Sequence, residues 1–498
     1  MNYRLLCKLL AMVLFTVDLA FAASLGAGFI RGDASGWNAV TVGWVASIGL
    51  ASSLALALFL YGRGAPNRLF RKEALAVIGI GWLLATLVGA LPYAFLLPVE
   101  ISGGWFNHMA DALFESASGL TTTGASVFTN LETFPDSLLF WRALSQWIGG
   151  LGVVVFFVAI LSFLGAGAKI LYSNEASASS ADIDSARIQK GVLRIFWFYF
   201  AISLLCCLAY YLLGMHIFDA LCHTFTTIST GGFSTYSASF AAFDSAAIEW
   251  TAILFMTLGG TSFLYMICAL RGNRQQMRSN SEVPAYLIFL VTGVAAMTLV
   301  LLTEGREDTL PHTIRRAAFQ VVSIMTSTGY ATENYNLWPG GAHVILLIVM
   351  VIGGCSGSTA GGIKVVRVVV GLRVAFRNIE LHFRPHVVRP IRANGRVLDR
   401  GDQQDVAVYF LICALMTFFT MGLLTLIQPT LAFEDLLSSI FACLFNIGPG
   451  LGKVGPSETY AFYDPISKTF LSLLMVMGRL EFYAILVLFS PSLWKRFS

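Results

Sequence analysis

Four segments of the chain could bind a cation through the oxygen atoms of their backbone. In each, a short apolar stretch precedes a break rich in glycine, and three of the breaks also carry threonine and serine. The predicted binding residues are Thr121, Thr122, Thr123 and Gly124; Ser229, Thr230, Gly231 and Gly232; Thr326, Ser327, Thr328 and Gly329; and Asn446, Ile447, Gly448 and Gly450. Small residues let backbone approach an ion, and a ring of carbonyls can replace its hydration shell. The pattern predicts a filter made mainly of backbone carbonyls.

The fourth segment departs from the other three, because it has neither threonine nor serine. Either Gly448 or Gly450 could correspond to Gly124 of the first segment, so its ligand set is open by two residues. The predicted ring is therefore asymmetric. Ordinary polar loops would be the alternative for a single segment, but four aligned copies argue against it.

A different glycine-rich run interrupts a later apolar stretch. Five glycines fall within ten residues, namely Gly353, Gly354, Gly357, Gly361 and Gly362. Such a run cannot hold a regular helix well. Irregular backbone at membrane depth must line a water-filled path or be buried in protein. We therefore expect a break in the middle of a membrane span, beside a cavity.

Glycine pairs occur at the matching place in the other units, after each filter-like segment. We interpret Gly149-Gly150 and Gly259-Gly260 as sites of close helix packing. In the last unit the pair becomes Gly478-Arg479. A charged residue within a span usually faces a partner or a cavity, so Arg479 is either a structural pair with Glu481 or a carbonyl, or a positive charge that sets a gate.

The elements that position these segments are membrane helices. The chain has 498 residues, of which 56% are hydrophobic and only 12% charged, with a net charge of +4. Soluble domains carry about 25% charged residues, so a soluble enzyme, a disordered scaffold and a nucleic-acid binder are all excluded as readings of the whole chain. Ten apolar stretches could each cross a membrane. They cover roughly residues 5–29, 38–61, 74–97, 140–165, 192–214, 248–270, 284–303, 341–371, 405–427 and 466–490.

The basic residues give this bundle an orientation. Arginine and lysine gather in segments 62–72, 271–278 and 364–400 and in the tail at Lys495 and Arg496, all on one side of the ten-span arrangement. The positive-inside rule makes that side cytoplasmic, with both termini there. The first stretch has an alternative reading as a signal peptide cleaved after Ala22, although its apolar run continues to Ile30.

No catalytic or cofactor motif is recognisable. The sequence has no HExxH, GxSxG or P-loop pattern, and its eight cysteines have no metal-binding spacing. Asp18, Glu115 and Glu481 are too scattered to suggest an intramembrane active site. We therefore predict that the chain is not an enzyme and has no cofactor of its own; a membrane enzyme, scaffold or sensor is the more remote alternative.

The sequence resembles the Trk-type potassium uptake membrane subunits, the family of TrkH, TrkG and KtrB. The motifs that carry the resemblance lie at residues 119–125, 228–234, 353–364 and 446–452. It implies an all-α polytopic fold with four membrane–pore–membrane repeats around one pore plus two N-terminal transmembrane helices, the arrangement of the TrkH branch. The implied units are residues 1–71 for the extra helices and 72–190, 191–282, 283–402 and 403–498 for the repeats.

The resemblance also implies a function. Potassium would be the substrate, taken up across the bacterial inner membrane by a homodimer in contact with lipid. A TrkA-like cytoplasmic ring would bind nucleotide and regulate it, and nucleic acid would not be a partner. The run at 353–362, with Lys364 and Arg479, would gate the pore, although Lys364 could instead snorkel toward the membrane surface. Passive potassium flow and potassium symport coupled to sodium or protons both stay open.

Overall fold

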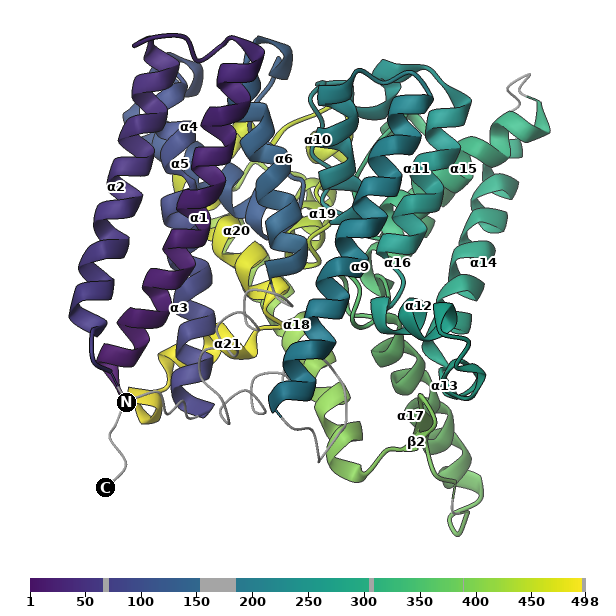
Figure 1. The fold of residues 1–498 in the computed structure, drawn as a ribbon. Helices are drawn as coiled ribbons and strands as arrows, with labels where there is room; N and C mark the ends of the chain where they lie inside the picture. The colour runs from purple at the N-terminus through teal and green to yellow at the C-terminus, as the bar shows by residue number, and fades with distance from the viewer. Residues whose placement is uncertain (66–70, 153–184, 304–308, 388, 495–498) are drawn as a thin grey trace.

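The computed structural model describes residues 1–65, 71–152, 185–303, 309–387 and 389–494. In this part of the chain the architecture is helical apart from one short β-hairpin (Figure 1). The N-terminal pair consists of α1 (Tyr3–Arg31) and α2 (Ala39–Gly62). Asn2 and Asn38 begin these helices, because their side chains accept hydrogen bonds from backbone N–H groups of the first turn. The residues around Ala22 lie in one continuous helix.

Each of the four repeats starts with a helix that crosses the bundle. These first spans are α3 (Arg71–Gly89) with α4 (Leu91–Leu96), α9 (Ser185–Leu212), α14 (Glu282–Leu302) and α18 (Arg400–Ile427). Helix α18 has a complete capping box, in which Asp399 and Asp402 bind each other's backbone N–H groups. The outward faces of these helices are apolar, as expected for contact with lipid.

A shorter helix follows each first span and stops within the bundle. These pore helices are α5 (Trp105–Leu120), α10 (Ile217–Ile228), α15 (Leu310–Met325) and α19 (Phe433–Leu444). They lie in the upper part of Figure 1. Their last turns are buried, so the predicted filter segments leave the helices inside the protein.

The second spans return from the filter segments, and three of them are visibly broken. They comprise α6 (Asp136–Leu151), α11 (Ala246–Gly259) with α12 (Phe263–Leu270), α16 (Gly340–Ile352) with α17 (Val365–Phe383), and α20 (Pro465–Arg479) with α21 (Tyr483–Leu486). The angle between α11 and α12 is 98°, and the last span, with α21 continued to Phe489, is bent by 115°. The predicted continuous spans 248–270 and 466–490 were therefore wrong in this respect, because a helix ends at Gly259 and at Arg479.

The four repeats close into a ring. Every pore helix contacts the second span of the preceding repeat: α10 meets α6, α15 meets α11 and α19 meets α16, while α5 meets α20. The last contact joins the first repeat to the fourth. Helix α1 packs against α3 and α6, and α2 packs against α1 and α4, so the N-terminal pair lies outside the ring beside the first repeat.

The remaining elements are short. They are α13 (Arg274–Ser279), α22 (Pro491–Trp494) and the antiparallel strands β1 (Arg392–Ala393) and β2 (Arg396–Val397). The 3₁₀ turns are η1 (Val99–Ser102), η2 (Leu131–Thr133), η5 (Ser239–Phe243), η6 (Tyr335–Leu337), η7 (Gly452–Val454), η8 (Tyr460–Phe462) and η9 (Val487–Phe489). Helix α13 and the hairpin lie together at the lower right of Figure 1.

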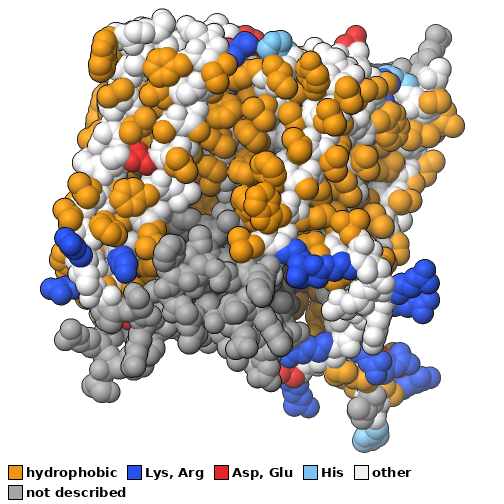
Figure 2. Space-filling model, in the orientation of Figure 1, with side chains coloured by type: hydrophobic (Ala, Val, Ile, Leu, Met, Phe, Trp, Pro, Cys, Tyr) orange, Lys and Arg blue, Asp and Glu red, His pale blue; other side chains and the backbone are white. Residues whose placement is uncertain are grey.

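The surface agrees with a membrane protein. Six described helices are long and apolar enough to cross a membrane, or up to eight if each bent pair is one span. Of the ten predicted spans, 140–165 extends into residues outside the description, and 341–371 is divided by the glycine-rich run. Figure 2 shows a broad hydrophobic surface with lysine and arginine gathered at the lower end. The first and last described residues share that end, since Asn2 N bonds Glu73 (3.2 Å) and Lys72 Nζ bonds the Ser492 carbonyl (3.1 Å).

Candidate ion filter and intramembrane loop

All four pore helices end in the same backbone turn. Two residues beyond each helix, the chain adopts the left-handed conformation, with φ of 54° at Thr122, 52° at Thr230, 55° at Ser327 and 54° at Asn446. The next N–H group then bonds the carbonyl five residues earlier, at 2.9, 2.8, 2.8 and 2.8 Å in the four repeats. Such a turn satisfies carbonyls that the end of a helix leaves open. The repeats therefore share one geometry despite their different side chains.

This geometry fixes the register of the fourth segment. A glycine with positive φ follows two residues after each left-handed residue, and in the fourth repeat it is Gly448, with φ of 96°. Gly450 does not occupy the equivalent position; its N–H bonds the Val454 carbonyl at 2.7 Å. Of the two predicted alternatives, Gly448 is the counterpart of Gly124, Gly232 and Gly329.

These four glycines form the contacts that close the ring. A Cβ atom on Gly124 would clash with the Gly231 carbonyl, one on Gly232 with Thr328, one on Gly329 with Ile447, and one on Gly448 with Thr123. In every case the clash is with the carbonyl that precedes the glycine of the next repeat. The backbones thus approach one another around a single axis, at a distance that leaves no room for a side chain.

Four of the ring's carbonyl oxygens belong to the left-handed residues. Thr122, Thr230, Ser327 and Asn446 are each at most 1% exposed. Among the described residues, no hydrogen-bond donor reaches the backbone oxygen of any of the four. Buried carbonyls normally have a partner, because leaving one unsatisfied costs about 1–3 kcal/mol. A cation or water at the ring's centre would supply that partner.

The described residues contain no group of three or more histidine, cysteine, aspartate or glutamate side chains that could hold a metal ion. Two pairs of filter hydroxyls bond each other, Thr121 with Thr123 at 2.7 Å and Thr326 with Thr328 at 2.8 Å, whereas the buried Thr122 hydroxyl has no partner among the described residues. In the fourth repeat the Asn446 amide takes this role by donating to the Thr123 hydroxyl at 2.9 Å. The chemistry available at the ring is therefore that of neutral oxygen ligands.

Buried polar side chains support the filter from behind. Gln146 of α6 donates to the Gly231 carbonyl at 2.7 Å and accepts from Phe233 N at 3.1 Å. Arg142 of the same helix pairs with Glu115 at 2.6 Å, and both side chains are at most 2% exposed. The first repeat thereby holds the filter segment of the second. We did not predict these residues, although a charged residue within an apolar span is the signal that could have revealed them.

A second buried ion pair joins the ends of the ring. Lys468 of α20 bonds Asp111 of α5 at 2.6 Å, with side chains 3% and 7% exposed. The pair lies at the contact between the fourth and first repeats. Burying two charges is costly unless they meet with good geometry, so the pair helps to fix how this interface closes.

The glycine pairs allow close packing against the pore helices, and one pair also lies where a helix ends. A Cβ atom on Gly149 would clash with the Leu120 carbonyl, and one on Gly478 with the Leu444 carbonyl, at the ends of their pore helices. A Cβ on Gly259 would come within 3.2 Å of the Ile228 carbonyl. Close packing therefore describes these positions, as predicted for the first two pairs. At Gly259-Gly260 close packing is combined with a helix end, because α11 stops at Gly259.

The glycine-rich run at 353–362 lies directly against the filter. Its Gly361 N–H bonds the Ser327 hydroxyl at 2.5 Å, and its Gly362 N–H bonds the Phe445 carbonyl at 2.9 Å. Thr359 bonds the Thr230 hydroxyl at 3.2 Å and the Ile228 carbonyl at 2.9 Å. We call residues 353–362 the intramembrane loop. It contacts the inner ends of the second, third and fourth filter segments.

Both predicted gate charges, Arg479 and Lys364, reach the same loop. Arg479 donates to the Thr359 carbonyl at 2.8 Å and to the Gly149 carbonyl at 3.3 Å, which links the loop to the fourth and first repeats. Lys364 Nζ donates to the Ala360 carbonyl, so it points back to the loop and does not snorkel. Of the structural alternatives for Arg479, the pair with Glu481 is wrong, because Glu481 pairs with Arg367, whereas the bond to a carbonyl is present.

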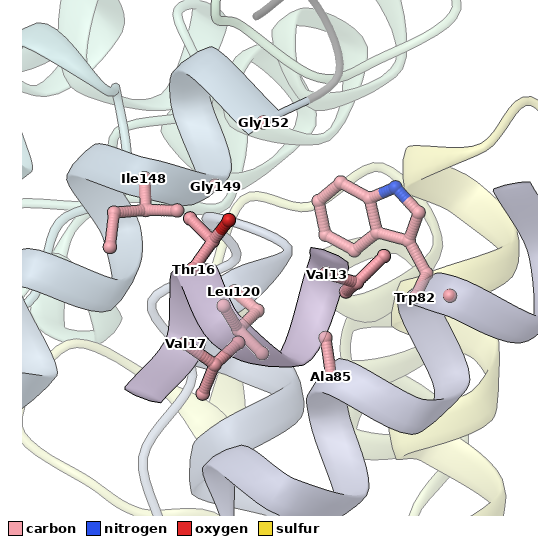
Figure 3. A pocket seen from close by; sticks show the side chains of 10 residues that line it. Val13, Thr16, Val17, Trp82, Ala85, Leu120, Ile148, Gly149 and Gly152 are labelled. Atoms are coloured by element: carbon pink, nitrogen blue, oxygen red, sulfur yellow. The ribbon is translucent and has the colours of Figure 1, made fainter. Parts of the chain in front are cut away.

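A small cavity of about 40 Å³ lies behind the first pore helix (Figure 3). Its lining comes from α1, α3, α5 and α6 and includes Val13, Trp82, Leu120 and Ile148. Thr16 is its one hydroxyl side chain. Its lining offers an ion no ring of oxygen ligands like that of the filter.

The comparisons with known proteins agree with this geometry. Residues 105–496 match the family model TrkH, described as a cation transport protein. The Trk system potassium uptake protein TrkH of Halomonas elongata is 31% identical over 497 residues, covering 100% of both chains. That of Salmonella typhimurium is 34% identical over 439 residues, covering 86% of this chain and 88% of its own. The crystal structure of the potassium transporter TrkH from Vibrio parahaemolyticus superposes with a TM-score of 0.86 at 28% identity, covering 99% and 100%.

A polytopic helical protein whose four repeats close around one ring of backbone oxygens is a membrane transporter. The chain belongs to the TrkH family of cation transport proteins. This confirms the predicted resemblance and fold class, and the family is a class of transporters, not of enzymes.

Proposed function

We propose that the protein takes up potassium ions through the ring of backbone oxygens. The observation that carries the proposal is the set of four buried carbonyls, at Thr122, Thr230, Ser327 and Asn446, for which the described residues provide no donor. Neutral oxygens that replace a hydration shell suit an alkali cation. Relatives that cover the whole chain bear the name of potassium uptake proteins.

The direct test is uptake of rubidium, a potassium analogue, into proteoliposomes that contain the purified chain. We expect uptake that follows the potassium gradient and that excess sodium does not suppress. Reversal potentials under imposed sodium and proton gradients separate passive flow from symport, because only a coupled transporter shifts its reversal potential with the second ion. Absence of rubidium uptake by correctly folded protein would refute the proposal.

The intramembrane loop is the gate of this pathway. It lies against three filter segments, and irregular backbone at this depth is stable only because it is buried. Arg479 holds the loop through the Thr359 carbonyl and adds a positive charge beside the cation path. The small residues of the loop allow it to move aside without a clash.

The hairpin end of the molecule faces the cytoplasm of a bacterial inner membrane and receives regulation there. Its exposed arginines, among them Arg384 and Arg392, follow the positive-inside rule. An acidic face of a TrkA-like nucleotide-binding ring is the partner that this charge fits, and the working form is a homodimer. Charge reversal at both arginines should abolish pull-down of the ring; retained pull-down would leave anionic lipid as their partner.

A further inference from the structure

Glu282, the first residue of α14, is a buried carboxylate for which the transport pathway gives no reason. We propose that Glu282 anchors the intramembrane loop, and that the hairpin β1–β2 controls this anchor through Ser281. The inference rests on the proposed function of the loop as a gate. To that function the inference adds two features. Glu282 holds the loop on the side of the hairpin, and Ser281 transmits a movement of the hairpin to the loop.

The contacts of Glu282 support the first half of the proposal. Its side chain accepts hydrogen bonds from Ser356 N at 2.6 Å and from Val366 N at 3.3 Å, and the residue is only 2% exposed. Ser356 belongs to the loop, and Val366 is in the first turn of α17. A carboxylate is favoured at both places, because it satisfies an irregular N–H group and faces the positive end of a helix.

The contacts of Ser281 support the second half. Its N–H bonds Asn394 Oδ1 at 3.0 Å, and its hydroxyl accepts from Asn394 N at 3.2 Å. Asn394 and Gly395 form the two-residue turn of the hairpin, both with positive φ. Asn-Gly is the preferred sequence for such a turn, so this turn is well defined. The hairpin turn is therefore hydrogen-bonded to Ser281, the residue that precedes Glu282.

The position of this contact lets a movement of the hairpin reach Glu282. The hairpin is exposed and lies with α13 and α17 at one end of the molecule (Figure 1). Asn280 fixes the same corner, since its side chain accepts from Glu282 N and Val283 N, both at 3.0 Å. A displacement of the hairpin would pull Ser281 and rotate this helix start. The Glu282 carboxylate would then leave Ser356, and the loop would lose a buried hydrogen bond.

The test measures the loop separately from ion flux. Cys355 of the loop is fully buried, so its rate of reaction with a water-soluble maleimide, resolved by mass spectrometry, reports loop opening. The variants are Glu282→Ala, Glu282→Gln, Asn394→Gly and the double variant Glu282→Ala with Asn394→Gly. Glycine at 394 keeps the left-handed turn and removes only the side chain. Asn273→Gly is the matched control, because Asn273 also caps a helix at this end but does not contact the loop.

We expect Glu282→Ala to raise the labelling rate of Cys355 about tenfold or more, since a bond to a charged group is lost. Glu282→Gln keeps an acceptor and should fall between Glu282→Ala and wild type. Asn394→Gly should raise labelling in the wild-type background and have no further effect in Glu282→Ala, whereas Asn273→Gly should match wild type.

Two results would overturn the proposal. If Cys355 in folded Glu282→Ala is labelled at a rate within twofold of wild type, Glu282 does not anchor the loop. Folding of each variant is checked by its gel-filtration profile and Tm. If Asn394→Gly and Glu282→Ala change the labelling rate of Cys355 independently in the double variant, the hairpin does not act on the loop through Ser281 and Glu282. Rubidium uptake is measured on the same samples. If labelling follows the prediction while no variant changes uptake, the anchor stands and the loop's function as a gate fails.

Discussion

Replacing Gly124 by serine tests whether the ring is the selectivity filter. Gly124 has φ of 83°, a conformation that side chains rarely adopt. A Cβ atom there would also clash with the Gly231 carbonyl of the next repeat. Serine is the smallest polar replacement, so the ring should be perturbed while the fold around it survives.

The size of the effect follows from these two costs. A residue with a Cβ in the left-handed region costs roughly 1–2 kcal/mol relative to glycine. The clash can be relieved only if one filter segment moves outward, because the Gly231 carbonyl is held by Gln146 on its other side. A difference of about 1.4 kcal/mol is a factor of ten in relative affinity. We therefore expect the preference for potassium over sodium to fall about tenfold.

The assay is the reversal potential of proteoliposomes under opposed potassium and sodium gradients, with sodium competition of rubidium uptake as a second measurement. Gly26→Ser is the matched control. Gly26 lies in helix α1 with nothing within 4 Å of an added Cβ, so this variant should keep the wild-type preference.

An unchanged ion preference in Gly124→Ser would refute the reasoning, provided that the variant elutes as folded protein. It would mean that the ring tolerates a displaced segment and that selection occurs elsewhere. A change of equal size in Gly26→Ser would mean that the assay reports general damage and not the filter.

Three further predictions follow from the contacts of the ring. Gly448→Ser should lower the potassium preference more than Gly450→Ser, as measured by reversal potential, because a Cβ on Gly448 meets the Thr123 carbonyl of the ring whereas one on Gly450 meets Val454 and Ser438; the opposite order would refute the register. Arg479→Ala should raise rubidium flux per folded protein several-fold, because the loop loses a charge-assisted bond of about 1.5–3 kcal/mol; flux at or below wild type would contradict its role. Lys468→Met should lower stability by about 3–5 kcal/mol in a thermal melt, because Asp111 is left buried and unpaired, and Asp111→Asn in the same chain should recover part of the loss.

The sequence alone was sufficient to predict the class of protein and the positions of its non-helical segments within the membrane. Long apolar stretches with few charges have one stable solution, which is a bundle of membrane helices. The run at 353–362 could not be a helix because of its glycine content, and the structure indeed ends α16 at Ile352. Four breaks of similar composition revealed the repeat. The composition of each break can be read from its own segment, so the tertiary structure was not needed to find it.

The tertiary structure decided everything that depends on a neighbour in another repeat. Gly448 and Gly450 are equally good filter glycines by composition, and only the turn after Asn446 and the contact with Thr123 distinguish them. The partner of Arg479 is likewise a carbonyl of another repeat, not the nearby Glu481. Backbone conformation at a chain break depends on which atoms of distant segments fill the space around it, and no local pattern of residues contains that information.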